Sequence, residues 1–358
     1  MLPMALTTRC FSDFESLQDK LEQWDKLACA LDRPLMAPAI LRAWWEHMRP
    51  EGAELRLIAV SDGEELVGFV SIVRFGRSYS WAGRPLIPGE PLAKPGLEAE
   101  VAAAIAADLA AARPRPLGIE FEIQGDSPEW ASLLCGAWPK PRRLLDRVHG
   151  AVKLPHLAFD EGGFDAWMQC QSANFRKDMK RKRRRLEERG ASLRFSDLSS
   201  LRGDIEALIR LHLSRQDEPS VFEAPGAAEM LHDVGTALIP EGRFRHVCVD
   251  LDGRVIGCLL VLAAGSGPSA FVSGFDEEFA ELSPNMVCFM QVIEDMAARG
   301  ERWFSLGSGG QRYKFRFANG EGELARHFLL PLAPRSVGSL AISALGSRTR
   351  SLVGRGRS

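Results

Sequence analysis

The sequence predicts an α/β protein with a mixed α+β sheet, built from two copies of one unit in tandem. A hairpin pattern occurs twice, because residues 55–73 and 244–262 each contain two apolar, β-branched runs joined by an Asp-Gly-type turn. The same kinds of element follow each hairpin in the same order. The length of 358 residues also exceeds the usual size of one domain and suits two.

The agreement between the two copies extends beyond the hairpins. Each hairpin is followed by a predicted strand, then a helix, then a short strand. These elements cover residues 78–82, 97–112 and 117–122 in the first copy and residues 269–275, 284–299 and 302–306 in the second. Chance similarity between two ordinary hairpins is the alternative, but it does not account for the shared order and spacing. We therefore predict a duplicated unit.

The segment between the copies is predicted to be one long helix over residues 164–189. It contains no Gly or Pro, and Gly190 follows it as a stop signal. A strand at 191–195 and helices at 201–216 and 227–238 are expected to open the second copy.

These elements divide the chain into four expected parts. We predict a degenerate first unit over 1–160, a basic linking helix over 161–190, an active second unit over 191–334, and a basic, disordered tail over 335–358.

Composition argues against several classes of protein. The formal net charge of −2 and the isoelectric point near 6.4 are unlike those of a protein that binds nucleic acid over its whole surface. The seven cysteines are scattered without a CxxC pair, so neither a disulfide framework nor a metal site is expected. No apolar stretch of about 18 residues occurs, and the N-terminus lacks a signal-peptide pattern. We expect a cytoplasmic protein without a transmembrane segment.

The second copy carries a series of short motifs in a fixed order. They are Ser273-Gly-Phe-Asp276, Leu282-Ser-Pro-Asn285, Leu306-Gly-Ser-Gly-Gly310 and Tyr313-Lys314, preceded by Asn174-Phe-Arg176 on the basic helix. Over about residues 165–331 this series resembles the GNAT-superfamily acetyltransferases associated with cellulose and exopolysaccharide biosynthesis, the CelD-type group. That group is related to the FemAB-like aminoacyl transferases, which also contain two GNAT-like units.

The resemblance implies a transferase that moves an acyl group from a coenzyme A thioester to an amine or hydroxyl. Acetyl-CoA or another acyl-CoA would be the co-substrate, and a small molecule or saccharide of exopolysaccharide or cell-envelope assembly the acceptor. Two other functions stay open. One is an aminoacyl-tRNA-dependent transferase of the FemAB-like kind, and the other is a GNAT-fold binding protein without turnover.

A predicted helix start provides candidate residues for binding the coenzyme A phosphates. Free N–H groups and the positive end of the helix dipole favour an anion there, at Ser283, Pro284, Asn285 and Met286, with Ser283 as the cap. Gly307, Gly309 and Gly310 could let backbone amides approach the same ligand. The usual GNAT phosphate loop, an Arg or Gln before Gly-x-Gly or Gly-x-Ala, is absent. An ordinary capped helix and a tight turn are the alternative interpretations.

Three residues are the candidates for catalysis. The resemblance implies that Tyr313 protonates the departing thiolate and that Lys314 holds a carboxylate or phosphate. Asp276, at the end of a predicted strand, is the candidate base. The alternatives are a half-buried aromatic, a surface lysine and a helix cap.

Three further residues, Arg312, Asp217 and Arg176, are candidates for contact with substrate. Arg176 opens the basic stretch 176–185, which holds eight Lys or Arg and one acid. That stretch could bind phosphates of tRNA or of a nucleotide-linked sugar, or it could be a solvated helix face. An apolar stripe of Trp167, Phe175, Met179 and Leu186 predicts that the segment packs on one side. No stable nucleic-acid partner is expected unless the donor is a tRNA.

Overall fold

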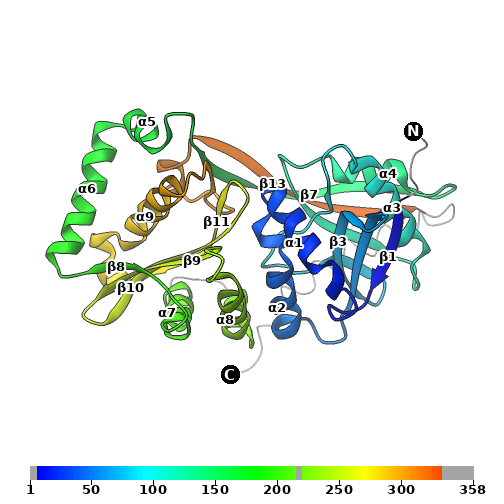
Figure 1. Ribbon diagram of the computed structural model, residues 1–358, viewed down its shortest axis with the longest axis horizontal. Helices are drawn as coiled ribbons and strands as arrows, with labels where there is room; N and C mark the ends of the chain where they lie inside the picture. The colour runs from blue at the N-terminus through cyan, green and yellow to red at the C-terminus, as the bar shows by residue number, and fades with distance from the viewer. Residues whose placement is uncertain (1–5, 215–219, 333–358) are drawn as a thin grey trace, which may run out of the picture.

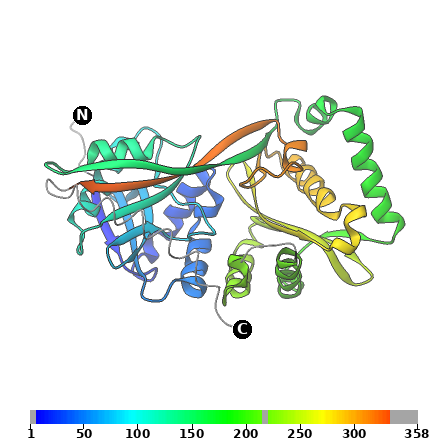
Figure 2. The same ribbon diagram turned by 180° about the vertical axis from the view of Figure 1, so that it is seen from behind.

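The computed structural model describes residues 6–214 and 220–332. In these residues one continuous 13-stranded mixed sheet runs through the molecule, with helices on both faces (Figures 1 and 2). The strand order is β1-β2-β3-β4-β6-β13-β7-β12-β11-β10-β9-β8, and β5 pairs with β3 beside this path. This is the mixed α/β class that the sequence predicts.

The first half of the chain contains the first copy of the unit. Its elements are β1 (Thr7–Phe11), α1 (Leu21–Ala30), η2 (Pro34–Met36), α2 (Pro38–Met48), β2 (Glu54–Asp62), β3 (Glu65–Phe75), β4 (Ser78–Trp81), β5 (Leu92–Ala93), α3 (Glu98–Ala111), β6 (Gly118–Gln124), α4 (Trp130–Ala137) and β7 (Arg143–Ala158).

The second half repeats the order strand, two helices, three strands, helix, strand and final strand. Its elements are α5 (Gly163–Cys170), α6 (Ala173–Glu188), β8 (Ser192–Phe195), α7 (Leu201–Leu213), α8 (Ala227–Leu238), β9 (Phe244–Leu251), β10 (Arg254–Ala264), β11 (Gly267–Phe275), η4 (Glu277–Leu282), α9 (Pro284–Ala298), β12 (Trp303–Ser305), η5 (Lys314–Arg316) and β13 (Gly320–Leu332). The predicted duplication is therefore confirmed.

The linking segment differs from its prediction, because α5 and α6 are two helices rather than one. The chain breaks at residues 171–172, and the Ser172 hydroxyl then accepts a hydrogen bond from the Phe175 N–H at 3.1 Å. A serine that can cap a helix favours a new start even without Gly or Pro nearby. The apolar stripe is confirmed, since Trp167, Phe175, Met179 and Leu186 are all buried. The predicted tail 335–358 lies outside the described residues.

The last strand of each copy pairs with a strand of the other copy. β13, which ends the second copy, lies between β6 and β7. β7, which ends the first copy, pairs with β12 of the second. In Figure 1 both strands run as long ribbons from one half of the molecule to the other. The two copies therefore share hydrogen bonds through exchanged strands.

The hydrophobic core on one sheet face also joins the two copies. Trp24 of α1 and Trp44 of α2 belong to the same cluster as Leu208 of α7 and Leu231 of α8. α2 packs directly against α8, where His47 Nε2 lies 2.6 Å from Asp233 Oδ2. The opposite face carries two separate cores, one beneath α3 and α4 and one beneath α5, α6 and α9. The halves are thus joined on one face and separate on the other.

A buried polar cluster holds the outer edge of the second copy. The Asp204 carboxylate accepts hydrogen bonds from both terminal nitrogens of Arg194, each at 2.7 Å, and from the Ser196 hydroxyl at 2.6 Å. Ser196 Oγ lies 3.0 Å from His246 Nδ1. Asp204, His246 and Cys248 are close enough to surround a metal ion. Arg194 neutralises the carboxylate, and burial raises the pKa of Cys248 to about 12, so this donor set fits a metal poorly.

This cluster predicts a loss of stability in mild acid. Burial lowers the pKa of His246 to about 4, against 6.5 for a free histidine. The unfolded chain takes up this proton at a higher pH than the folded chain does. The free energy of unfolding therefore decreases as the pH falls from 6.5 towards 4. We expect the free energy of unfolding to fall by about 2 kcal/mol more between pH 7 and 5 in the native protein than in a His246→Gln variant. Urea titrations at both pH values measure this difference, and equal losses would contradict it.

Candidate active site

The candidate site lies where strands β11 and β12 diverge. These parallel strands pair at a single position, Ser269 opposite Ser305. Beyond it a cavity of ≈ 430 Å³ opens between residues 269–273 of β11 and residues 305–308. Phe289 of α9 and Tyr313 also line it. Where two parallel strands separate, their backbone groups are available to bind a ligand. Ligand sites in α/β proteins are commonly found at the ends of strands in such a gap.

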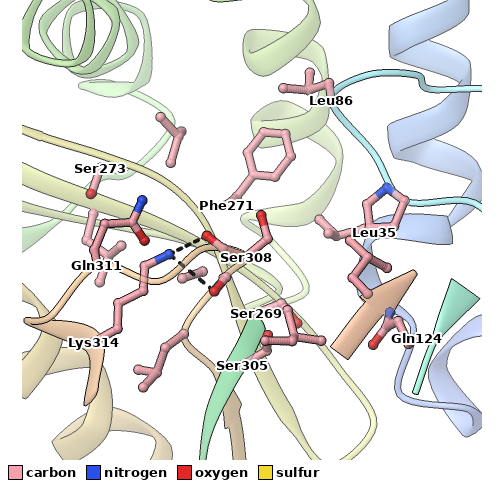
Figure 3. Close-up of a pocket in the computed structure, with 18 of the residues that line it drawn as sticks. Leu35, Leu86, Gln124, Ser269, Phe271, Ser273, Ser305, Ser308, Gln311 and Lys314 are labelled. Carbon is pink, nitrogen blue, oxygen red and sulfur yellow. Dashed lines mark hydrogen bonds between the residues drawn. The ribbon is translucent and has the colours of Figure 1, made fainter. Parts of the chain in front are cut away.

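The first copy closes the other side of this cavity. Leu35, Leu86 and Gln124 belong to the first copy and line the cavity opposite Ser269, Phe271 and Ser305 (Figure 3). No local sequence motif marks these three residues, so the sequence does not predict their place in the cavity. The cavity is therefore built from both copies, although the recognisable motifs all come from the second.

Lys314 is the most unusual side chain in the cavity. It is only 7% exposed, and its ammonium donates hydrogen bonds to the carbonyl oxygens of Gly307 at 3.2 Å and Ser308 at 2.7 Å (Figure 3). Burial lowers the pKa of Lys314 to about 8. Two of its three protons are used in this way, so one can reach a ligand. The surface-lysine alternative is wrong.

The glycine loop positions the carbonyl groups that hold Lys314. Gly307 has φ +79°, and a Cβ there would lie 3.0 Å from the Ala270 carbonyl oxygen and 3.5 Å from Lys314 Nζ. Glycine is required where such a φ coincides with so close an approach. Gly309 also has a positive φ, but neither Gly309 nor Gly310 lines the cavity. Of the three glycines, only Gly307 therefore reaches the cavity.

Tyr313 lines the cavity next to Lys314 in the sequence. Its ring makes an edge contact with Phe289, with centroids 5.5 Å apart, and it is half-buried. Gln311 also lines the cavity from the same turn. The structure thus brings Tyr313, Lys314 and Gly307 together as the sequence motifs suggest.

The start of α9 lies apart from this cavity. Pro284, Asn285 and Met286 are buried, and none of residues 283–286 lines the cavity. Ser283 has a left-handed backbone and does not cap α9 with its side chain, so its expected capping role is wrong. Its hydroxyl instead accepts a hydrogen bond from Lys182 at 3.1 Å. In this structure the first turn of α9 is covered.

The remaining candidate residues also lie outside the cavity lining. Asp276 caps η4 by accepting the Glu278 N–H at 3.1 Å and pairs with Arg254. Arg176 donates to the carbonyl groups of Met168, Gln169 and Gln171 at the end of α5. Arg312 is exposed. Asp217 lies outside the described residues.

A second cavity of ≈ 380 Å³ adjoins the first and was not anticipated from the sequence. Ser269 and Ser305 line both. His156 of β7 lines the second cavity, pairs with Ser305 across the sheet, and stacks on Trp303 at 3.9 Å. Burial lowers the pKa of His156, so its imidazole is neutral at pH 7 and can accept a proton. Only the strand exchange brings this histidine here.

Comparison with known proteins agrees with this architecture. Residues 173–315 match the family described as "Acetyltransferase (GNAT) domain". FemX superposes with a TM-score of 0.61 at 12% identity, covering 94% of this chain and 99% of that one. L-PGS from Bacillus licheniformis gives 0.56 at 12% identity, covering 96% and 98%. A tandem GNAT protein of the clavulanic acid biosynthesis pathway gives 0.50 at 13% identity, covering 92% and 99%. No curated protein sequence matches the chain.

The chain thus has the tandem GNAT fold of these proteins. Its second copy, over residues 173–315, contains the GNAT-superfamily domain. In the part of the chain that the structure describes, no helix is long and apolar enough to cross a membrane.

Proposed function

We propose that the protein transfers an acyl group from a coenzyme A thioester to an amine or hydroxyl acceptor held between the two copies. The observation that carries this proposal is Lys314, a buried ammonium beside Tyr313 in a cavity at the opening of β11 and β12. A buried charged group with a lowered pKa in a cleft is a common property of active sites. The sequence resemblance to the CelD-type group supports a saccharide or another cell-envelope acceptor.

The chain's own residues can carry out both proton transfers that the reaction requires. The acceptor forms a new C–N or C–O bond to the acyl carbon, and the C–S bond to the thiol breaks. Lys314 stabilises the negative charge that develops on the carbonyl oxygen, an interaction that gains strength in a site shielded from water. His156 takes the proton from the acceptor, and Tyr313 gives a proton to the departing thiolate.

The two adjoining cavities support separate places for donor and acceptor. The cavity of Tyr313 and Lys314 suits the thioester, and the cavity of His156 suits the nucleophile. Ser269 and Ser305 lie between them and line both. Reaction across this pair needs no opening of the sheet, because β11 and β12 are not hydrogen-bonded beyond it.

Release of free thiol from acetyl-CoA in the presence of a panel of amines and saccharides tests this function. We expect Tyr313→Phe and His156→Gln each to lower kcat/KM by about 10²–10⁴-fold, the usual contribution of a positioned acid or base. Both replacements keep the size of the side chain. Unchanged rates in Tyr313→Phe would remove the tyrosine from the mechanism, and failure of acetyl-CoA and a longer acyl-CoA to bind in a calorimetric titration would overturn the donor.

An aminoacyl-tRNA donor is the second candidate. It is favoured by the exposed cations of α6, among them Lys177, Lys180 and Arg185. Binding through such residues should weaken steeply with salt, since each phosphate contact releases counterions. Titration of a short RNA at two salt concentrations separates this donor from coenzyme A.

A further inference from the structure

A groove on the second copy lies between the start of α6 and the turn η5. It has a volume of ≈ 700 Å³ and is lined by Gln171, Ser172, Asn174, Phe175, Lys177, Asp178, Arg181, Phe315 and Arg316. The turn η5 separates this groove from the candidate active site. Lys314 of the turn lines the active-site cavity, whereas the next two residues line the groove.

The groove carries an excess of positive charge. Lys177, Arg181 and Arg316 face one acid, Asp178, among its lining residues. Asp178 accepts hydrogen bonds from Arg181 at 2.7 Å and Arg316 at 2.8 Å. Burial raises the pKa of Asp178, but these partners and Lys182 outweigh it and lower the pKa. The carboxylate therefore stays charged and fixes both guanidinium groups in place.

The N-terminal end of α6 adds to this field. Ser172 caps the helix, which runs for 16 residues, and its first turn faces the groove at Asn174 and Phe175. The positive end of a helix of this length favours an anion by the same physics as the cations. Two independent sources of positive potential thus meet in one groove.

An exposed aromatic ring completes the groove. Phe315 is 38% exposed, and Lys153 Nζ lies 5.5 Å from its ring centroid. Arg316 lies over the ring of Phe175, which is buried, at 5.5 Å. An exposed aromatic ring beside cations is an arrangement on which nucleobases stack while the cations hold their phosphates.

We infer that this groove binds a phosphorylated adenine nucleotide, the chemical group at the end of coenzyme A. The inference rests on the proposed function for its purpose, because the groove would hold the donor's nucleotide while its thioester occupies the cavity across η5. It also gives the donor's phosphates a binding surface although the first turn of α9 is covered.

Calorimetric titration of the full chain with adenosine 3′,5′-bisphosphate tests the groove without any thioester. We expect one binding site, weakened about tenfold by Phe315→Ala and by Lys177→Glu. Lys180→Glu is the matched control, since Lys180 is an exposed lysine of the same helix that does not line the groove. It should change the affinity by less than about twofold, because surface charges outside the site are screened by salt.

Three results would overturn the inference. They are absence of bisphosphate binding, equal weakening by the Lys177 and Lys180 variants, and no effect of Phe315→Ala. Tighter binding of a short RNA ending in CCA, weakened equally by Lys180→Glu, would replace the nucleotide with an RNA strand. Binding of bisphosphate to a protein that transfers no acyl group would overturn the proposed function alone, and transfer without bisphosphate binding would overturn the groove alone.

Discussion

Replacing Lys314 by methionine is expected to lower kcat/KM for acyl transfer by about 10²–10³-fold, the usual cost of removing one donor to a developing oxyanion. Methionine has a similar length and no charge, so the cavity keeps its shape while the buried cation is lost. In the native protein kcat/KM should also fall as pH rises through about 8, where the ammonium loses its proton. The residual activity of the variant should lack this dependence. Initial rates from pH 6 to 9.5 measure both effects.

The same residue should leave a signature in stability that does not depend on catalysis. Burial lowers the pKa of Lys314 to about 8 from 10.5, so the unfolded chain binds this proton more tightly than the folded chain. Stability is therefore reduced below pH 8 and recovers as pH rises from 8 towards 10.5. Between pH 7 and 10 the native protein should gain about 2 kcal/mol relative to Lys314→Met in urea titrations.

A matched control separates these effects from general loss of charge. Lys26→Met removes an exposed lysine from α1, so it should alter neither the rate nor the pH dependence of stability between pH 7 and 10. If Lys314→Met unfolded the protein, the lysine would be structural through its bonds to the Gly307 and Ser308 carbonyl groups. If the variant were folded and fully active, Lys314 would have no part in the reaction.

The sequence predicts the fold well where local pattern decides the structure. The duplicated hairpins become β2–β3 and β9–β10, because their turn residues and alternating apolar positions act within a few residues. The break between α5 and α6 was missed because it depends on one capping hydroxyl, Ser172, within a segment of strong helix formers. The exchange of β7 and β13 could not be predicted, since either pairing would satisfy the same apolar pattern.

The same distinction between local pattern and tertiary structure applies to the residues of the candidate site. Tyr313, Lys314 and Gly307 form one short motif and were found from the sequence, and the structure brings them together in one cavity. His156 and Gln124 reach the two cavities only through tertiary pairing and carry no local signal. The burial of Lys314 is likewise a tertiary property, because it depends on where the loop carbonyl groups lie.

The exchange of strands leads to a second large expected effect, that the protein does not fold when either exchanged strand is missing. Residues 161–358 expressed alone lack β7, which pairs with both β12 and β13, and lack α2, which covers α8. A chain ending at residue 319 lacks β13 and leaves β6 and β7 without the strand between them. Unpaired strand edges and an exposed shared core should prevent folding of either fragment. Circular dichroism and gel filtration of both fragments measure this result.

A chain ending at residue 332 is the control, because it keeps every described strand and should fold as the full protein does. The intact protein should then unfold in one urea transition. Six of the eight tryptophans, buried Trp24 and Trp44 among them, lie in the first copy, so fluorescence reports mainly on that copy, whereas circular dichroism reports on the helices of both copies. Coincident curves are expected because the core beneath α1, α2, α7 and α8 is common to both copies. Two separate transitions would show that the exchanged strands do not couple the copies.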